Sequence, residues 1–257
     1  MQRPPHHAEP AGPAGHTGAK SMQKSHRRPV QQRLLMAFCG LVLLAPTLRA
    51  EEYHQKHHFN RRLFTAGTFS MDVRTGDIYI TGWDDPHVEI EAEKIVHAKS
   101  EKRAERRYKR IKILLDGQDE VVRLRTLYPP RRPWRPFRGE SSLTVNFYIH
   151  MPYDCNLDLK VVDGDVKVDG VVGKEKIMVN YGQVEVDVPS VNRLRSVRAK
   201  TWLGNVQSNL RGENNAGFDK KVLFWNPNGT QDIQLKVHMG GIYIFQGEEE
   251  YPPGNIP

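Results

Sequence analysis

Aspartate recurs in the valine-rich second half of the chain, where a cluster of carboxylates could bind calcium. The residues concerned are Asp163, Asp165, Asp169 and Asp187. The calcium-binding β-roll requires the run GGxGxD in strict nonapeptide series, and the sequence contains no such run. We therefore interpret these carboxylates as solvated side chains at outward positions of strands.

Three histidines, His54, His57 and His58, are spaced closely enough to offer metal ligands if their segment were helical. No cysteine or acidic partner follows them at ligand spacing. We therefore predict that residues 51–66 form a solvated polar lead-in. We predict no metal site and no cofactor.

Motifs typical of catalysis are missing from the sequence. It has no Ser-His-Asp order, no G-x-S-x-G, no H-E-x-x-H and no phosphate loop. Glu89, Glu91 and Glu93 alternate along one face of a predicted strand, which indicates an exposed face and not an acid–base pair. We predict a protein that is not an enzyme and has no catalytic residues. A β-helical carbohydrate-active enzyme is the minor alternative.

Arginine and lysine gather between residues 99 and 138. Eight of them fall within 99–112: Lys99, Lys102, Arg103, Arg106, Arg107, Lys109, Arg110 and Lys112. A second group alternates with aromatic residues: Arg131, Arg132, Trp134, Arg135, Phe137 and Arg138. Arginine beside aromatic rings suits anionic headgroups or acidic glycans. The alternative is a solvated helix face followed by a proline-stiffened loop.

The net charge of +8 is unevenly distributed. Residues 1–50 hold seven Lys or Arg and one Glu, so only +2 belongs to residues 51–257. Because the basic character lies mostly in the N-terminal segment, it is poor evidence for a nucleic-acid partner. We expect no nucleic acid. The partner could be an envelope protein, a glycan or an anionic membrane surface.

The first fifty residues are typical of a targeting sequence. Residues 1–33 are polar and basic, and we predict that they are disordered. The run LLMAFCGLVLLAPTL then provides the apolar part of a signal peptide at 34–50. As a helix its fifteen residues would rise about 22 Å, short of the roughly 30 Å hydrocarbon core. We predict cleavage between Ala50 and Glu51; an uncleaved anchor and a start at Met22 are alternatives. The protein would then be periplasmic, in the outer cell envelope, or secreted.

A glycine followed by alternating β-branched residues recurs along the rest of the chain. Five copies begin at Gly76, Gly164, Gly182, Gly204 and Gly240, and each follows a segment of alternating residues. Period-two alternation predicts strands with one inward face, and glycine permits a tight corner between them. Units of about 20 residues are too short to bury their own faces, which favours stacking around a shared core. We predict an all-β fold, a β-solenoid or β-roll, with an antiparallel β-sandwich as the alternative.

The domain is predicted to span residues 65–246. The charged run SEKRAERRYKR at 100–110 predicts one short exposed helix. Residues 128–139 carry four prolines and predict an irregular loop. The acidic, proline-containing residues 247–257 predict a disordered tail.

Three longer phrases resemble the bacterial "putative adhesin" family: FSMDVRTGDIYITGWDDPHVEIEAEK, VNFYIHMP and LDLKVVDGDVKVDGVVGKEKIMVNYGQVEVDV. The order of the parts carries the resemblance: a first copy, a Trp-Asp turn, a charged linker, a strand ending in Pro, then serial copies. The resemblance implies a β-helix-like or β-roll domain in the cell envelope, with no catalytic residues. We therefore predict a non-catalytic exported envelope protein whose adhesin-like domain provides an interaction surface. Binding of anionic membranes or polysaccharides through segment 99–138 is the alternative.

Overall fold

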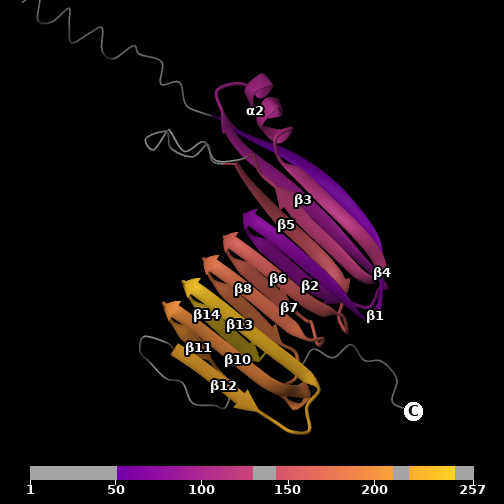
Figure 1. The fold of residues 1–257 in the computed structure, drawn as a ribbon, viewed down its shortest axis with the longest axis vertical. Helices are drawn as coiled ribbons and strands as arrows, with labels where there is room; N and C mark the ends of the chain where they lie inside the picture. Colours follow the sequence, from indigo (N-terminus) through magenta and orange to yellow (C-terminus); the bar gives the residue numbers. More distant parts are fainter. Residues whose placement is uncertain (1–50, 130–142, 211–219, 247–257) are drawn as a thin grey trace, which may run out of the picture. The chain divides into compact units, whose positions relative to one another are not determined.

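The computed structural model describes residues 51–129, 143–210 and 220–246, without the side chains of 220–223 (Figure 1). Contacts divide the chain into two units, Met1–Thr47 and Leu48–Pro257, and every described residue lies in the second. Several predicted segments lie outside the described residues: the basic N-terminus, the signal segment up to Ala50, the tail 247–257 and loop residues 130–139.

The described chain is nearly all β, as predicted. Its strands are β1 (Glu51–Thr75), β2 (Ile78–Trp83), β3 (His87–Ala98), β4 (Lys112–Leu127), β5 (Leu143–Pro152), β6 (Asn156–Asp163), β7 (Val166–Asp169), β8 (Glu175–Tyr181), β9 (Val184–Val188), β10 (Leu194–Leu203), β11 (Val206–Ser208), β12 (Lys220–Trp225), β13 (Gln231–Met239) and β14 (Ile242–Gln246). The α-helix is α2 (Glu101–Tyr108), and η1 (Val191–Arg193) is a 3-10 turn. The predicted charged helix is therefore confirmed.

All the strands belong to one mixed, open sheet. Their order is β11-β14-β9-β7-β2-β5-β3-β1-β6-β8-β13-β10-β12, with β4 also paired to β1. Strand β1 joins two parts of the sheet, because residues 51–62 pair with β3 and residues 68–75 pair with β6.

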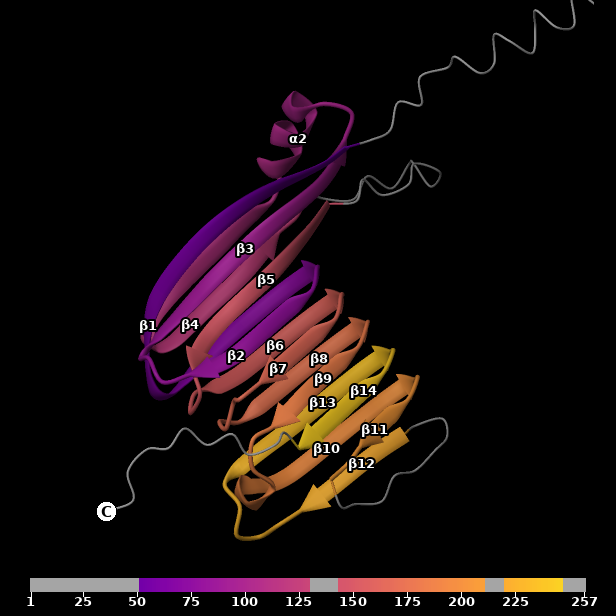
Figure 2. The ribbon, with the colours of Figure 1, turned by 180° about the vertical axis from the view of Figure 1, so that it is seen from behind.

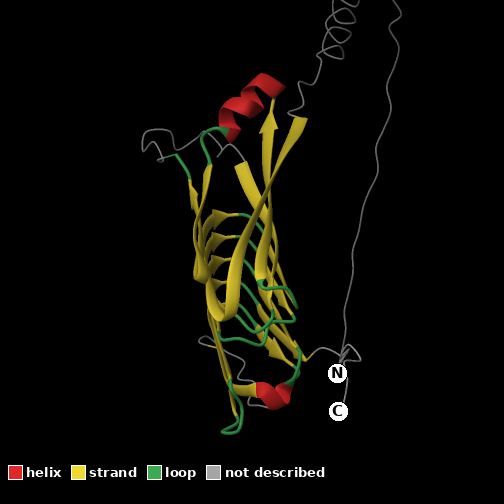
Figure 3. Ribbon diagram, turned by 90° about the vertical axis from the view of Figure 1, so that its right-hand side faces the viewer, coloured by secondary structure: helices red, strands yellow, loops and turns green. Residues whose placement is uncertain are grey.

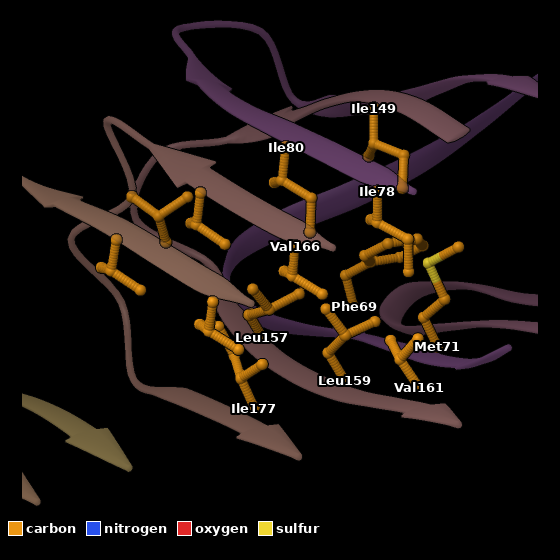
Figure 4. Packing of buried hydrophobic residues seen from close by; sticks show 14 of the residues in the cluster. Phe69, Met71, Ile78, Ile80, Ile149, Leu157, Leu159, Val161, Val166 and Ile177 are labelled. Carbon is orange, nitrogen blue, oxygen red and sulfur yellow. The ribbon is translucent and has the colours of Figure 1, made fainter. Parts of the chain in front are cut away.

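The sheet folds back at β1 into two facing layers (Figure 3). We call the part from the first half of β1 through β3 to β11 layer A. Layer B is the part from β4 and the second half of β1 to β12. The side chains that alternate inward from both layers form the core, as Ile78, Ile80 and Val166 do opposite Phe69 and Leu159 (Figure 4). Burying each such side chain contributes about 1.5–3 kcal/mol.

Each repeated glycine lies at a corner where the chain passes from layer B to layer A. Gly182 has φ +136°, and a Cβ there would collide with the carbonyl oxygen of Gly164. Gly164 has φ +147° and meets the carbonyl oxygen of Gly76 in the same way. The corners therefore stack on one another, and a side chain would break both the backbone conformation and the stacking.

Strands of successive copies pair in parallel, but the copies do not follow chain order. Layer B runs β6, β8, β13, β10, and layer A runs β7, β9, β14, β11. The β13–β14 unit, which is last in the sequence, thus lies between β8–β9 and β10–β11 (Figure 2). In a regular solenoid each copy contacts its neighbours in sequence, and this chain departs from that rule.

The predicted polar lead-in, residues 51–66, is part of the sheet. Strand β1 starts at Glu51, well before residue 65, where we predicted the domain to begin. Its polar side chains pair with those of β3: Lys56 Nζ lies 2.7 Å from Glu91 Oε1, and His54 Nδ1 lies 3.1 Å from Glu93 Oε1. These contacts accompany the backbone pairing of residues 51–62 with β3, through which a segment with few apolar residues extends the sheet.

Cys155 is fully buried, and its thiol donates a hydrogen bond to the Phe64 carbonyl oxygen at 3.0 Å. Burial, with a smaller effect of Asp154, raises the pKa of the Cys155 thiol to about 12. The group stays protonated at physiological pH and acts as core packing and not as a nucleophile.

Candidate functional site

The outer face of layer B is strongly basic. Its exposed cations are Arg123, Arg125, Lys160, Lys176, Arg198, Lys200 and Lys236. They come from five strands, β4, β6, β8, β10 and β13, where each occupies an outward position beside an inward apolar residue. Alternation therefore concentrates the charge on one face of the layer.

Strand register aligns these cations in two rows. In one row Lys176 pairs with Gln234, which pairs with Arg198. In the other row Lys236 pairs with Lys200. Hydrogen-bonded strands lie about 4.8 Å apart, so Lys176 and Arg198, which are two strands apart, are separated by about 10 Å. The rows also contain acids: Asp158 is the neighbour of Lys176, and Asp72 lies between Arg125 and Lys160. An extended anionic ligand lying across the strands can contact the cations of one row.

A groove of about 650 Å³ opens on this face. Six of the residues that line it are Asp158, Lys174, Lys176, Arg198, Trp225 and Gln234. It crosses the layer from β1 to β12, near the beginnings of β6, β8, β10 and β13. The Trp225 side chain is 68% exposed, so its indole face is free to stack against a ligand.

One wall of the groove is fixed by a β-bulge in β10. The bulge between Leu194 and Ser196 places Arg195 beside Asp232. Asp232 accepts hydrogen bonds from Arg195 Nε at 2.9 Å and Ser196 Oγ at 2.7 Å. The charge of Arg195 is thereby neutralised. Across residues 51–129, 143–210 and 220–246, neither Lys176 nor Arg198 makes an ion pair.

A buried carboxyl group, Glu175, is in the strand that lines the groove. Glu175 occupies an inward position, between Leu157 and Ile233 on the neighbouring strands. Its Oε1 accepts a hydrogen bond from Gln231 Nε2 at 3.0 Å, and Gln231 also donates to the Val171 carbonyl oxygen. Burial raises the pKa of Glu175 to about 8, so the group is mostly neutral at physiological pH.

The outer face of layer A has the opposite character. The aligned Tyr79 and Tyr148 rings stack with centroids 5.2 Å apart, and both side chains are about 40% exposed. Carboxylates dominate around them: Glu89, Glu91, Glu93, Asp169, Glu185 and Asp187. Lys167 is paired with Glu185 at 2.7 Å. The outer faces of the two layers therefore differ in charge, with cations prevailing on layer B and carboxylates on layer A.

The three histidines do not converge. His54 and His58 lie beside Glu93 and Glu91 on the outer side of β1, whereas His57 lies on the inner side. Burial, and then the nearby Lys94, lower the pKa of His57. No group of three metal-ligating side chains occurs within the described part of the chain.

The predicted basic segment is only partly described. Lys102, Arg103 and Arg106 lie on the exposed face of α2, whose Ala104 and Tyr108 pack against β3. The aromatic-flanked group, Arg131, Arg132, Trp134, Arg135, Phe137 and Arg138, lies outside the described residues. The predicted cleavage site is described only from Glu51, the first residue of β1.

Sequence reasoning missed the groove. The alternation of the sequence predicts that Lys176 and Arg198 point outward. Their proximity, however, depends on β13 lying between β8 and β10. Neither the alternation nor the glycine spacing indicates that neighbour order. Trp225 also escaped notice because β12 lacks the glycine corner of the other copies.

Among solved structures, the chain is similar to a "putative cell adhesion protein" from Clostridium sporogenes, with 13% identity and a TM-score of 0.47. That match covers 75% of this chain and 100% of the other. A "putative adhesin" from Bacteroides fragilis matches at 10% identity and TM-score 0.23, over 75% and 97% of the two chains. A "putative lipid binding protein" from Parabacteroides distasonis matches at 8% identity and TM-score 0.23, over 77% and 98%.

The solved structures that resemble the chain thus include proteins called adhesins, the kind of protein that its sequence resembles. No protein-family model and no curated protein matches the chain. Among the residues that the structure describes, no helix is long and apolar enough to span a membrane.

Proposed function

We propose that this chain is a non-catalytic, exported cell-envelope protein that binds an acidic polysaccharide on the outer face of layer B. The observation that carries the proposal is the groove, where Lys176 and Arg198 lie across from each other and Trp225 is exposed. Cations bind carboxylate or phosphate groups of a glycan, and an indole face stacks on sugar rings.

The arrangement of the cations favours a linear chain as the ligand. The charges follow two register rows across five strands, and the groove runs in the same direction. A polymer with regularly spaced anions can contact several positions of such a row at once, which raises its affinity through multivalency. The cell-envelope setting makes glycan a more suitable ligand than nucleic acid.

The fold supplies a rigid platform for this face. We interpret the parallel strand pairs, joined at stacked glycine corners, as the rungs of a short β-roll in the proposed domain of 65–246, now extended to 51. Each rung is fixed by backbone hydrogen bonds to its neighbours, so the cations hold their spacing without a ligand. Such preorganisation suits binding and requires no catalytic group.

Export is proposed from the N-terminal sequence. The apolar segment 34–50 precedes Glu51 directly, and Glu51 is also the first residue of β1. Cleavage after Ala50 would release a chain that begins with its first strand. The proposed location is the periplasm, the outer envelope or the exterior.

The test is binding of the full chain to polygalacturonate, with neutral dextran as the comparison ligand, by isothermal titration calorimetry. We expect binding to polygalacturonate only, weakened by salt because exposed charges are screened. The double variant Lys176→Gln/Arg198→Gln should weaken binding about tenfold, and Trp225→Ala should weaken it further.

The matched control is Lys102→Gln/Arg103→Gln, which removes two cations from α2. Unchanged binding by this control supports the layer B site. Equal loss in both double variants would instead favour the alternative surface, segment 99–138. That alternative is tested directly by changing Arg131, Arg132, Arg135 and Arg138 to Ser. Turnover of polygalacturonate would contradict the non-catalytic proposal.

A further inference from the structure

Large apolar side chains are exposed along the rim where layer B turns into layer A. The residue before each corner glycine continues the inward-facing series of its strand. The core ends at that point, so the side chain has no facing layer to pack against. Tyr181, Leu203 and Met239 occupy this position and are 49%, 42% and 37% exposed. These side chains therefore project over the rim and not into the core.

Strand register places the three side chains next to one another. Met239 pairs with Tyr181 on one side and with Leu203 on the other. Trp202, which is 58% exposed, lies beside them and stacks on His238 with ring centroids 4.7 Å apart. Val162 on β6 is 40% exposed. We call Val162, Tyr181, Trp202, Leu203 and Met239 the corner ridge.

Lysines follow the ridge along its layer B side. Lys160 lies two residues before Val162, and Lys200 lies two residues before Trp202. Lys236 lies two residues before His238, on which Trp202 stacks. Residues i and i+2 of a strand share a face and lie about 7 Å apart. Each lysine ammonium is therefore placed just behind the apolar edge.

We propose that the corner ridge binds the surface of an anionic lipid bilayer, with its apolar side chains entering the interface and Lys160 and Lys236 contacting headgroups. Contiguous exposed apolar surface marks an interaction site. Tryptophan and tyrosine favour the membrane–water interface, where one part of the ring system is apolar and another is polar. Lysines near the surface add electrostatic attraction to anionic lipid.

Charge complementarity favours lipid over a second copy of the chain as the occupant. The ridge is bordered by lysines. If two copies of the chain met through this ridge, their lysines would repel each other. On β1 and β6 the position before the glycine is polar, Thr75 or Asp163. Apolar residues hold this position only on β8, β13 and β10, and β6 adds the neighbouring Val162. A ridge of this length suits shallow insertion.

This surface is distinct from the proposed glycan groove. The groove lies near the beginnings of the layer B strands, and the ridge lies at their ends. Lys160 and Lys236 belong to the basic face that both proposals use, so the apolar ridge residues distinguish the two. Trp202→Ser/Met239→Ser should leave polygalacturonate binding unchanged, and Lys176→Gln/Arg198→Gln should leave apolar insertion intact.

The experiment is co-sedimentation with vesicles of phosphatidylcholine, with and without phosphatidylglycerol. It uses the full chain and, in parallel, residues 48–257, the compact unit that contains the whole described core; circular dichroism and a thermal melt check that this unit folds. We expect the unit to bind only vesicles with phosphatidylglycerol, with a blue shift of tryptophan fluorescence that Trp202→Phe removes.

The double variant Trp202→Ser/Met239→Ser should lower the partition coefficient by roughly tenfold or more. Its matched control is Tyr79→Ser/Tyr148→Ser, which removes two similarly exposed side chains from layer A. The variant Lys160→Gln/Lys236→Gln should weaken binding to anionic vesicles severalfold, unlike Lys102→Gln/Arg103→Gln. If the ridge double variant melts early, Leu203→Ser alone serves in its place.

Several outcomes overturn the proposal. They are no binding by the wild-type unit, equal loss in the layer A control, or equal binding to vesicles without phosphatidylglycerol. Binding that depends on the lysines but not on the ridge residues would also overturn it, because headgroup attraction alone would then account for the result.

Discussion

Glu175 occupies a core position that neighbouring strands give to Leu157 and Ile233. Burial raises the pKa of this carboxyl group to about 8, so the group is mostly protonated and neutral in the folded protein at physiological pH. The unfolded chain, with a pKa near 4.5, releases this proton at much lower pH. The residue therefore couples the stability of the domain to pH.

We expect the free energy of unfolding to fall as pH rises from about 4.5 to about 8, because only the folded state then keeps the proton. The variant Glu175→Gln should remove most of this dependence and be more stable than wild type by a few kcal/mol above pH 8. Urea unfolding across this pH range measures it. An unchanged slope in Glu175→Gln, or the same effect from exposed Glu185→Gln, would contradict the assignment.

The corner glycines make a second prediction at the residue scale. Gly182→Ala requires a side chain at φ +136° and against the Gly164 carbonyl oxygen, so we expect a loss of about 2–4 kcal/mol. Gly170→Ala is the matched control: at φ +69° its Cβ would have only ordinary contacts, and about 1 kcal/mol should be lost. Chemical denaturation compares the two; equal losses would rule out corner stacking as the cause.

At the scale of elements, period-two alternation predicted most strands correctly, because each inward apolar residue carries its own signal. The helix α2 was predicted from the charged run at 100–110. Strand β1 shows where that signal fails. Its first twelve residues are mostly polar, and they form a strand by pairing with β3, where Lys56, His54 and His58 meet glutamates. Complementary charges on distant segments are recognisable only when the pairing is known.

At the scale of the molecule, the all-β class and the glycine corners followed from the sequence, whereas the order of the copies did not. Every copy presents the same alternation and the same glycine, so any copy can pair with any other in a similar register. The groove and the corner ridge both depend on β13 lying between β8 and β10. The candidate surfaces therefore could not be predicted from single copies.

The inserted position of β13 and β14 predicts a sharp response to truncation. A chain ending at residue 230 should lose cooperative unfolding and aggregate, because β8 and β10 would both lack their shared neighbour. A chain ending at residue 246 should melt like the full chain, which also tests the proposed tail. Size-exclusion chromatography and thermal melts compare the two. A stable, monomeric chain ending at 230 would contradict the described strand order.

The late place of this unit in the sequence also affects how the protein is made. Synthesis and the proposed export both proceed from the N-terminus, so β10 to β12 emerge before β13, which separates β10 from β8. Until residue 246 has emerged, β8 and β10 either remain unpaired on the sides that β13 will occupy or pair with each other and later separate. Completion of the domain is thus timed by its last strands, and a chain interrupted before them exposes strand edges that a quality-control protease could recognise.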